Sequence, residues 1–323
     1  MKKTEKYRFA IIASFIVIAI LLRIWLFLAD HAPVSDTPNN IASLIAGLFV
    51  IPLVYKIAKD STGNIEAGLF AAALSIAIPL YSWRTVGQFT HTLAIGFFFL
   101  TILLFMKLKD IGDWKKIIVV PLIFAFIHVY SLALIPIFGL YFLFSKLEDR
   151  KLSKNEIIFA GVSSLFIFLI FLFFTASPAF LALAKQHIDI QYYSIAAENF
   201  TLVNAFALAG MIPVYIGFLG AYFGLKKRKK SALLVLSTVC IFFLIMISKI
   251  SAIMLSLPYF IIGLTIMASF AYEEFKKAIE VSKFKKFNKQ ISIFVFILII
   301  ILGILHWIFT IDPNFLLHFQ FLL

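Results

Sequence analysis

The side chains that could do chemistry lie in short polar stretches that separate long apolar runs. One of these stretches, DHAPVSDTPNN at 30–40, contains Asp30 and Asp36 but no Lys or Arg. A carboxylate there could act as a general base that takes a proton from an acceptor hydroxyl. Cations and histidines elsewhere could hold a phosphate group, although each could also be a loop residue in water. They are Arg84 and His91 in WRTVGQFTHT, Lys185 and His187 in 176–200, and Lys249.

Two further candidates lie inside apolar runs, where a charge costs roughly a few kcal/mol unless it reaches the interface or finds a partner. Arg23 has two interpretations: its side chain reaches the outer interface, or it pairs with Asp30. The spacing of seven places both on one helix face if the helix continues. His128, in AFIHVYS, is either a packed, hydrogen-bonded histidine or a contact to substrate or lipid phosphate.

The motifs that are missing exclude several classes of protein. The chain has no Walker sequence, GxSxG, HExxH or GxGxxG, which argues against an ATP-driven pump and a soluble-type hydrolase. Cys240 is the only cysteine, so no disulfide can form within the chain. No cofactor is predicted. Binding of a divalent cation on the outer side is left open, because hard and borderline metal ligands occur there without a recognised spacing. These residues are Asp30, His31, Asp36, His187 and Asp189.

The elements that position these residues are predicted to be transmembrane helices. Of the 323 residues, 63% are hydrophobic and 14% are charged, against about 45–50% and about 25% in soluble domains. The net charge of +13 is divided among clusters between apolar runs, so nucleic acid is not a predicted partner. We expect an all-α polytopic membrane protein with about eleven spans. The runs are 9–29, 41–58, 67–83, 92–106, 117–129, 132–145, 156–175, 201–224, 231–248, 252–271 and 291–309.

The distribution of basic residues predicts the orientation. With Met1 inside, 25 of the 29 Lys and Arg residues fall on the inner side, which is the positive-inside pattern. The pattern requires two short spans hinged near Tyr130 and Ser131. One long helix there would move every later loop to the opposite side of the membrane and so reverse the bias. It places the C-terminus outside. The segment 272–290 is predicted to be a cytoplasmic basic interfacial segment on anionic lipid. Gly220 and Gly224, four residues apart, indicate close helix packing.

Several stretches resemble the membrane glycosyltransferases of the GT-C superfamily, which use polyprenyl-phosphate-linked sugars. The resemblance is strongest over 41–145. The quoted stretches are SLIAGLFVIPLVYKIAKDSTGNIEAGLFAAALSIAIPLYSWRTVG, FFFLTILLFMKL, AFIHVYSLALIPIFGLYFLF and, further on, SKISAIMLSLPYFIIGLTIMA. The resemblance implies a GT-C-like helical bundle with Asp30 as the catalytic base and Asp36 as the second choice. It also implies that Arg84 and Lys249 face the lipid phosphate and that His128 is the hinge histidine.

We therefore expect a single transmembrane domain over 1–323 in a prokaryotic plasma membrane. The expected function is transfer of a sugar from a polyprenyl-phosphate-linked donor to an acceptor on the extracytoplasmic face. The first outer loop has only about eleven residues, whereas the family's loop is usually much longer. Two alternatives stay open: a non-catalytic binding or assembly subunit that works with a second membrane subunit, and a transporter of lipid or solute.

Overall fold

The predicted helices are present. The computed structural model describes residues 3–28, 37–76, 78, 89–108, 114–176, 209–248 and 253–311, and these residues contain no strand. The α-helices in them correspond to the eleven apolar runs, which confirms the all-α prediction. They are α1 (Lys3–Leu28), α2 (Thr37–Thr62), α3 (Ile65–Ile76), α5 (Phe89–Met106), α7 (Val119–Ile127), α8 (Leu134–Leu147), α9 (Lys154–Thr175), α13 (Met211–Lys226), α14 (Lys230–Ile247), α15 (Ile253–Val281) and α16 (Asn288–Ile311). Three 3₁₀ helices join some of them: η1 (Trp114–Lys116), η2 (Val129–Ala133) and η3 (Lys283–Phe287).

Many of these helices are long and apolar enough to cross a bilayer. Within the described ranges there are seven such segments. They are Ile41–Thr62, Phe89–Met106, Val129–Leu147, Lys154–Thr175, Lys230–Ile247, Leu255–Val281 and Lys283–His306. Shorter apolar helices cover Ala10–Arg23, Ile65–Ile76 and Met211–Lys226. The chain is an integral membrane protein; eleven crossings and the orientation of the termini stay predictions.

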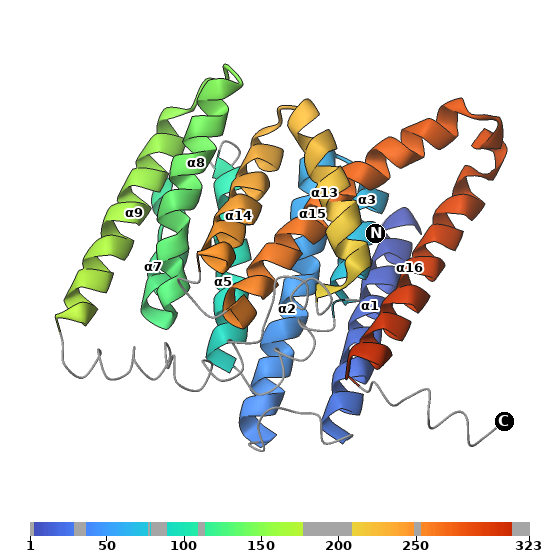
Figure 1. Ribbon diagram of the computed structural model, residues 1–323, viewed down its shortest axis with the longest axis horizontal. Helices are drawn as coiled ribbons and strands as arrows, with labels where there is room; N and C mark the ends of the chain where they lie inside the picture. The colour runs from blue at the N-terminus through green and yellow to red at the C-terminus, as the bar shows by residue number, and fades with distance from the viewer. Residues whose placement is uncertain are drawn as a thin grey trace.

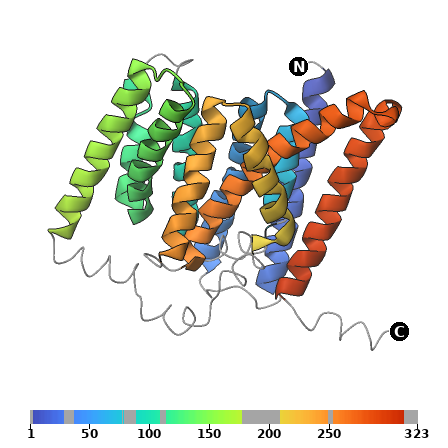
Figure 2. The same cartoon turned by 45° about the horizontal axis from the view of Figure 1, so that its top comes forward.

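The bundle is organised around α15, which crosses its centre (Figures 1 and 2). Every residue of α15 from Ser256 to Tyr272 is buried, and this helix packs against α13, α14, α3 and α2. Helices α7, α8 and α9 form one flank beside α5, whereas α1 and α16 lie on the other flank (Figure 1). The main apolar core therefore lies between α2, α5, α8, α14 and α15.

Small residues allow α13 and α15 to approach closely, as the glycine spacing predicted. A Cβ atom added at Gly220 would overlap the backbone carbonyl of Met267. One added at Gly217 would lie 2.6 Å from the Cβ of Leu264. At Gly224 the nearest atom would be the flexible end of the Met267 side chain, at 2.8 Å. The added atoms at Gly217 and Gly220 would both meet backbone of α15, and the approach is closest at Gly220.

We expect Gly220→Ala to destabilise the protein, because the new methyl group meets backbone that cannot move aside. Overpacking of this kind costs about 1–3 kcal/mol of unfolding free energy. Thermal unfolding of the detergent-solubilised protein measures the effect. Gly139→Ala in α8 is the matched control, since nothing lies within 4 Å of the added Cβ atom, and it should leave stability unchanged or raise it by up to about 1 kcal/mol. Equal melting temperatures for the two variants would contradict the close packing.

The predicted hinge between two short helices is also present. Helix α7 ends at Ile127, and His128 has an extended backbone with φ −156° and ψ 138°. The backbone N–H of Tyr130 donates to Nδ1 of His128 at 3.2 Å, and the N–H of Ser131 donates to the His128 carbonyl at 3.1 Å. The chain then reverses through η2 into α8. His128 therefore both ends α7 and begins the turn that follows.

The basic turns lie together at one end of the bundle, which we call the ion-pair end. Ion pairs there join segments that are far apart in the sequence. They include Lys107–Asp60 at 3.3 Å, Lys276–Glu66 at 2.9 Å, Arg228–Glu148 at 2.7 Å and Lys227–Glu274 at 3.0 Å. The lysine distribution predicted that these segments share one side. The ion pairs show that they share one end.

Glu156 forms the most buried part of the ion-pair end. Its side chain is only 3% exposed, and its carboxylate lies 2.7 Å from Nζ of Lys230 and 3.1 Å from Nη2 of Arg150. It also accepts from the backbone N–H of Ser153 at 2.9 Å, which completes a capping box at the start of α9. Lys230 donates in addition to the Phe105 carbonyl at 2.7 Å. These contacts join α5, α9, α14 and the turn after α8.

The segment 272–290 begins as a direct continuation of α15 and passes through η3 into α16. At the turn, the apolar side chains Val281, Phe284 and Phe287 are 88%, 63% and 55% exposed, among exposed lysines. Its position on anionic lipid stays a prediction.

Candidate functional site

Three of the nine predicted site residues lie within the described part of the chain: Arg23, His91 and His128. The other six fall outside the described residues, so their proposed roles stay predictions. They are Asp30, Asp36, Arg84, Lys185, His187 and Lys249.

The structure brings His91 and His128 together, although the sequence singled them out separately. His91 is in the first turn of α5 and is 5% exposed. Its ring centroid lies 5.3 Å from that of His128, at the hinge between α7 and η2. The hinge between α7 and α8 and the first turn of α5 thus bring the two histidines into contact. This contact lies at the end of the bundle opposite the ion-pair end.

Two tyrosines complete this group, which we call the His–Tyr cluster: His91, His128, Tyr130 and Tyr259. The Tyr130 ring lies 5.1 Å from His128 and 5.2 Å from Tyr259, and the Tyr259 ring lies 5.8 Å from His91. Tyr259, near the start of α15, is stacked on Phe242 of α14 with ring centroids 4.6 Å apart. The cluster therefore draws side chains from α5, the α7–η2 hinge and α15.

The polar atoms of the cluster are the candidates for contact with a ligand. Tyr259 is fully buried, and its hydroxyl has no hydrogen-bond partner among the described residues. Because leaving a buried hydroxyl unpaired costs about 1–3 kcal/mol, such a group commonly marks a place where water or a ligand binds. The His128 Nδ1 accepts from the Tyr130 N–H, so a neutral His128 carries its proton on Nε2. Phosphate oxygens and sugar hydroxyls both accept hydrogen bonds from a tyrosine hydroxyl.

The sequence did not single out Tyr130 or Tyr259. Both stand in apolar runs, where a tyrosine is common in a packed core and carries no spacing that marks a site. The available signals were their neighbours: Tyr130 is two residues after His128, and Tyr259 directly follows Pro258 in SLPYF.

Arg23 is buried in α1, with 1% of its surface exposed. Its Nη1 donates to the backbone carbonyl of Ala19, one turn earlier in the same helix, at 3.0 Å. This bond satisfies part of the hydrogen-bonding capacity of the buried guanidinium. Pairing with Asp30 involves a residue outside the described ranges and stays a prediction.

Metal binding has no support within the described ranges. In them, no group of three or more His, Cys, Asp or Glu side chains could hold a metal ion. The ligands that the sequence offered for an outer divalent cation, Asp30, His31, Asp36, His187 and Asp189, all lie outside these ranges. That site stays untested.

A bundle of apolar helices long enough to cross a bilayer indicates a polytopic membrane protein, and the buried His–Tyr cluster at one end is its candidate site. The chain belongs to the dolichyl-phosphate-mannose-protein mannosyltransferase family, whose model matches residues 13–174. This match confirms the resemblance to GT-C membrane glycosyltransferases. The matched range includes His91, His128 and Tyr130 but not Tyr259.

One solved structure similar to this chain is the archaeal oligosaccharyltransferase AglB from Archaeoglobus fulgidus, in complex with an inhibitory peptide and a dolichol-phosphate. The sequence identity is 14% and the TM-score is 0.49. The match covers 92% of this chain and 47% of AglB, so this chain spans about half the length of that protein. No curated protein sequence matches the chain.

Proposed function

We propose that the chain transfers a sugar from a polyprenyl-phosphate-linked donor to an acceptor on the extracytoplasmic face of a prokaryotic plasma membrane. The observation that supports this most is the family match over residues 13–174, which contains both histidines of the cluster. The cluster adds buried polar groups at the end of the bundle away from the ion-pair end. The positive-inside pattern assigns the ion-pair end to the cytoplasm.

In the proposed reaction, the acceptor oxygen forms a bond to C1 of the donor sugar while the bond from C1 to the phosphate oxygen breaks. The electron pair of that bond leaves with the polyprenyl phosphate. Asp30, or Asp36 as second choice, takes the acceptor proton. Attack from the side opposite the phosphate inverts the configuration at C1.

The charge that develops on the departing phosphate needs stabilisation by groups already in place. We assign this role to Arg84 and Lys249, with Lys185 and His187 as further candidates. Arg84 precedes α5 in the sequence and Lys249 follows α14, and the cluster contacts both of these helices. The hydroxyl of Tyr259 would donate a hydrogen bond to the phosphate or to a sugar hydroxyl.

A second candidate function is a non-catalytic subunit that needs a membrane partner. It is favoured by the short connection between the first two helices: α1 ends at Leu28 and α2 begins at Thr37. Such a connection leaves little chain to shape an acceptor site.

The test is turnover by the purified single chain in nanodiscs, given polyprenyl-phosphate mannose with a radiolabelled sugar and a mixture of candidate acceptors. Release of polyprenyl phosphate together with labelled acceptor supports the proposal. Turnover that appears only with a co-purifying membrane protein favours the subunit. Movement of the donor across the bilayer without a covalent product would instead identify a transporter and overturn the proposal.

Tyr259→Phe separates a role in the site from a role in packing. We expect donor turnover to fall about 10- to 100-fold, because one charge-assisted hydrogen bond is lost. The unfolding free energy should stay unchanged or rise by about 1 kcal/mol, because the removed hydroxyl has no partner among the described residues. Turnover and thermal unfolding measured on the same preparation check both outcomes.

Tyr215→Phe is the matched control for this change. Tyr215 lies on the outer face of α13 and is 70% exposed, so neither turnover nor stability should change. Normal turnover in Tyr259→Phe would remove Tyr259 from the proposed site.

A further inference from the structure

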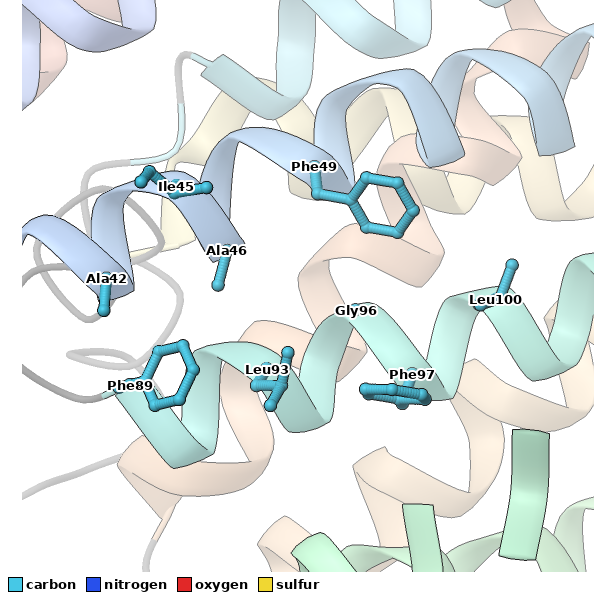
Figure 3. A pocket seen from close by; sticks show the side chains of 9 residues that line it. All are labelled: Ala42, Ile45, Ala46, Phe49, Phe89, Leu93, Gly96, Phe97 and Leu100. Carbon is cyan, nitrogen blue, oxygen red and sulfur yellow. The ribbon is translucent and has the colours of Figure 1, made fainter. Parts of the chain in front are cut away.

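Exposed apolar side chains occur in two different settings in this protein. Along the flanks of the bundle they have apolar neighbours: the groove between α2 and α5, for example, is lined by Ala, Ile, Leu, Gly and Phe residues alone (Figure 3). Such a surface suits contact with lipid tails, which are as apolar as leucine. At the turn between α15 and α16 the exposed apolar side chains lie among lysines instead, so this surface is of a different kind.

Ser282 fixes the backbone of this turn. Its Oγ accepts from the backbone N–H of Phe284 at 3.0 Å and donates to a carbonyl in the last part of α15 at 2.8 Å. The chain then forms η3, and in a 3₁₀ helix side chains three residues apart lie above one another. Phe284 and Phe287 therefore share one face of η3, whereas Lys283 and Lys286 share another.

The apolar face of the turn is open to the surroundings of the protein. Val281, Phe284 and Phe287 are each more than half exposed. Adjacent exposed apolar side chains mark a contact with a membrane or with another protein, because water alone leaves their burial unused. The charge around them decides between the two.

Four exposed lysines surround this face: Lys283, Lys285, Lys286 and Lys289. Residues 281–290 contain no Asp or Glu. Lysines earlier in the segment pair with carboxylates of the bundle, whereas the ion pairs found among the described residues include none of these four. The surface therefore combines aromatic side chains with positive charge, which complements the negative surface of a membrane with anionic lipid.

The position of the turn fits the same partner. Figure 1 shows α15 crossing the bundle obliquely, so that η3 lies at the edge of the bundle beside the start of α16. The helical segments on both sides of the turn, Leu255–Val281 and Lys283–His306, are long and apolar enough to cross a bilayer. A turn that joins two such segments lies at the level of the lipid headgroups.

We propose that the α15–α16 turn binds anionic phospholipid of the leaflet at the ion-pair end. The two phenylalanine rings enter the boundary between headgroups and acyl chains, and the lysine ammonium groups donate to phosphate oxygens. The sequence predicted only that 272–290 lies on anionic lipid. The fold restricts the contact to 281–289, because the earlier residues belong to α15 and form ion pairs with the bundle. This binding does not depend on the proposed sugar transfer.

Lys285→Gln combined with Lys286→Gln tests the role of charge. The full-length protein in detergent micelles is titrated with phosphatidylglycerol or phosphatidylcholine, and bound lipid is counted by native mass spectrometry. We expect the wild type to bind phosphatidylglycerol more tightly than phosphatidylcholine. The double variant should bind phosphatidylglycerol about 10- to 30-fold more weakly, since each lysine near an anionic surface contributes about fivefold. Its affinity for phosphatidylcholine should not change.

Lys115→Gln combined with Lys116→Gln is the matched control. These two lysines are also adjacent and exposed in a 3₁₀ helix, η1, which packs against α9 on the opposite flank. The control removes the same charge, yet it should leave the affinity for phosphatidylglycerol unchanged. Equal losses in the two double variants would show general charge attraction and would overturn a site at the turn.

Phe284→Ser tests the apolar face. It should weaken the binding of both lipids, because the hydrophobic contribution does not depend on headgroup charge. Phosphatidylglycerol with a diazirine near its headgroup should label residues 281–287 in the wild type, and this labelling should be lost in Phe284→Ser. Labelling confined to other parts of the chain would overturn the proposal. A wild type without preference for phosphatidylglycerol would also overturn it and leave the turn to an acidic protein partner.

Discussion

Asp30→Asn is expected to abolish sugar transfer while the protein stays folded. An amide has the shape of the carboxylate but cannot take the acceptor proton, and loss of a general base costs about 10²- to 10⁴-fold in rate. Turnover of the radiolabelled donor, measured beside thermal unfolding, checks the result. Asp149→Asn is the matched control, because Asp149 is exposed in the turn between α8 and α9 at the ion-pair end. This control should keep full activity.

Asp36→Asn distinguishes the two candidate bases. With Asp30 as the base, the Asp36 variant keeps most of its activity, and the reverse pattern would assign the role to Asp36. Full activity in both variants would remove the proposed proton transfer.

Glu156→Gln is expected to cause the largest loss of stability. Its carboxylate faces Lys230 and Arg150, and Lys230 is itself only 16% exposed. Neutralising one partner of a buried ion pair leaves the other charge buried, which costs about 3–5 kcal/mol of unfolding free energy. Denaturant or thermal unfolding of the protein in detergent micelles measures this loss.

Lys277→Gln provides the comparison, because Lys277 is 54% exposed and pairs with Glu273 and Glu274. Exposed pairs are worth at most about 1 kcal/mol. Combining Glu156→Gln with Lys230→Met should recover part of the lost stability, since no uncompensated charge remains at Lys230. Equal losses of unfolding free energy for Glu156→Gln and Lys277→Gln would show that burial does not increase the cost of breaking an ion pair at this end.

Hydropathy predicted the helices well because a span needs a continuous apolar run of a certain length. The hinge was predicted because only two short helices keep the lysines on one side. Hydropathy marks only the apolar part of α15: the apolar run stops near 271, and the helix continues to Val281. Ion pairs of Glu274 with Lys227 and of Lys276 with Glu66 stabilise this polar continuation. Hydropathy does not report such tertiary pairs.

The candidate site was predicted only in part, for a similar reason. His128 stands out because histidines are rare in apolar runs, and His91 stands out in the polar stretch that precedes the run 92–106. Tyr259 is 131 positions after His128 in the sequence, and only the packing of α15 against α5 and the hinge places it beside the histidines. The sequence analysis did not single out Glu156, because no sequence signal pairs it with Lys230. Packing partners far apart in sequence cannot be derived from one chain's hydropathy.

Accessibility labelling tests the central claim most directly, which is that the end of the bundle with the His–Tyr cluster faces the exterior. Cys240 is the only cysteine, so Cys240→Ser gives a background for single-cysteine variants. With Asp36→Cys, we predict that a membrane-impermeant maleimide labels intact cells. With Lys151→Cys, in the turn at the ion-pair end, we predict labelling only after the cells are permeabilised. The opposite pattern would place the cluster end in the cytosol and contradict the proposed extracytoplasmic sugar transfer.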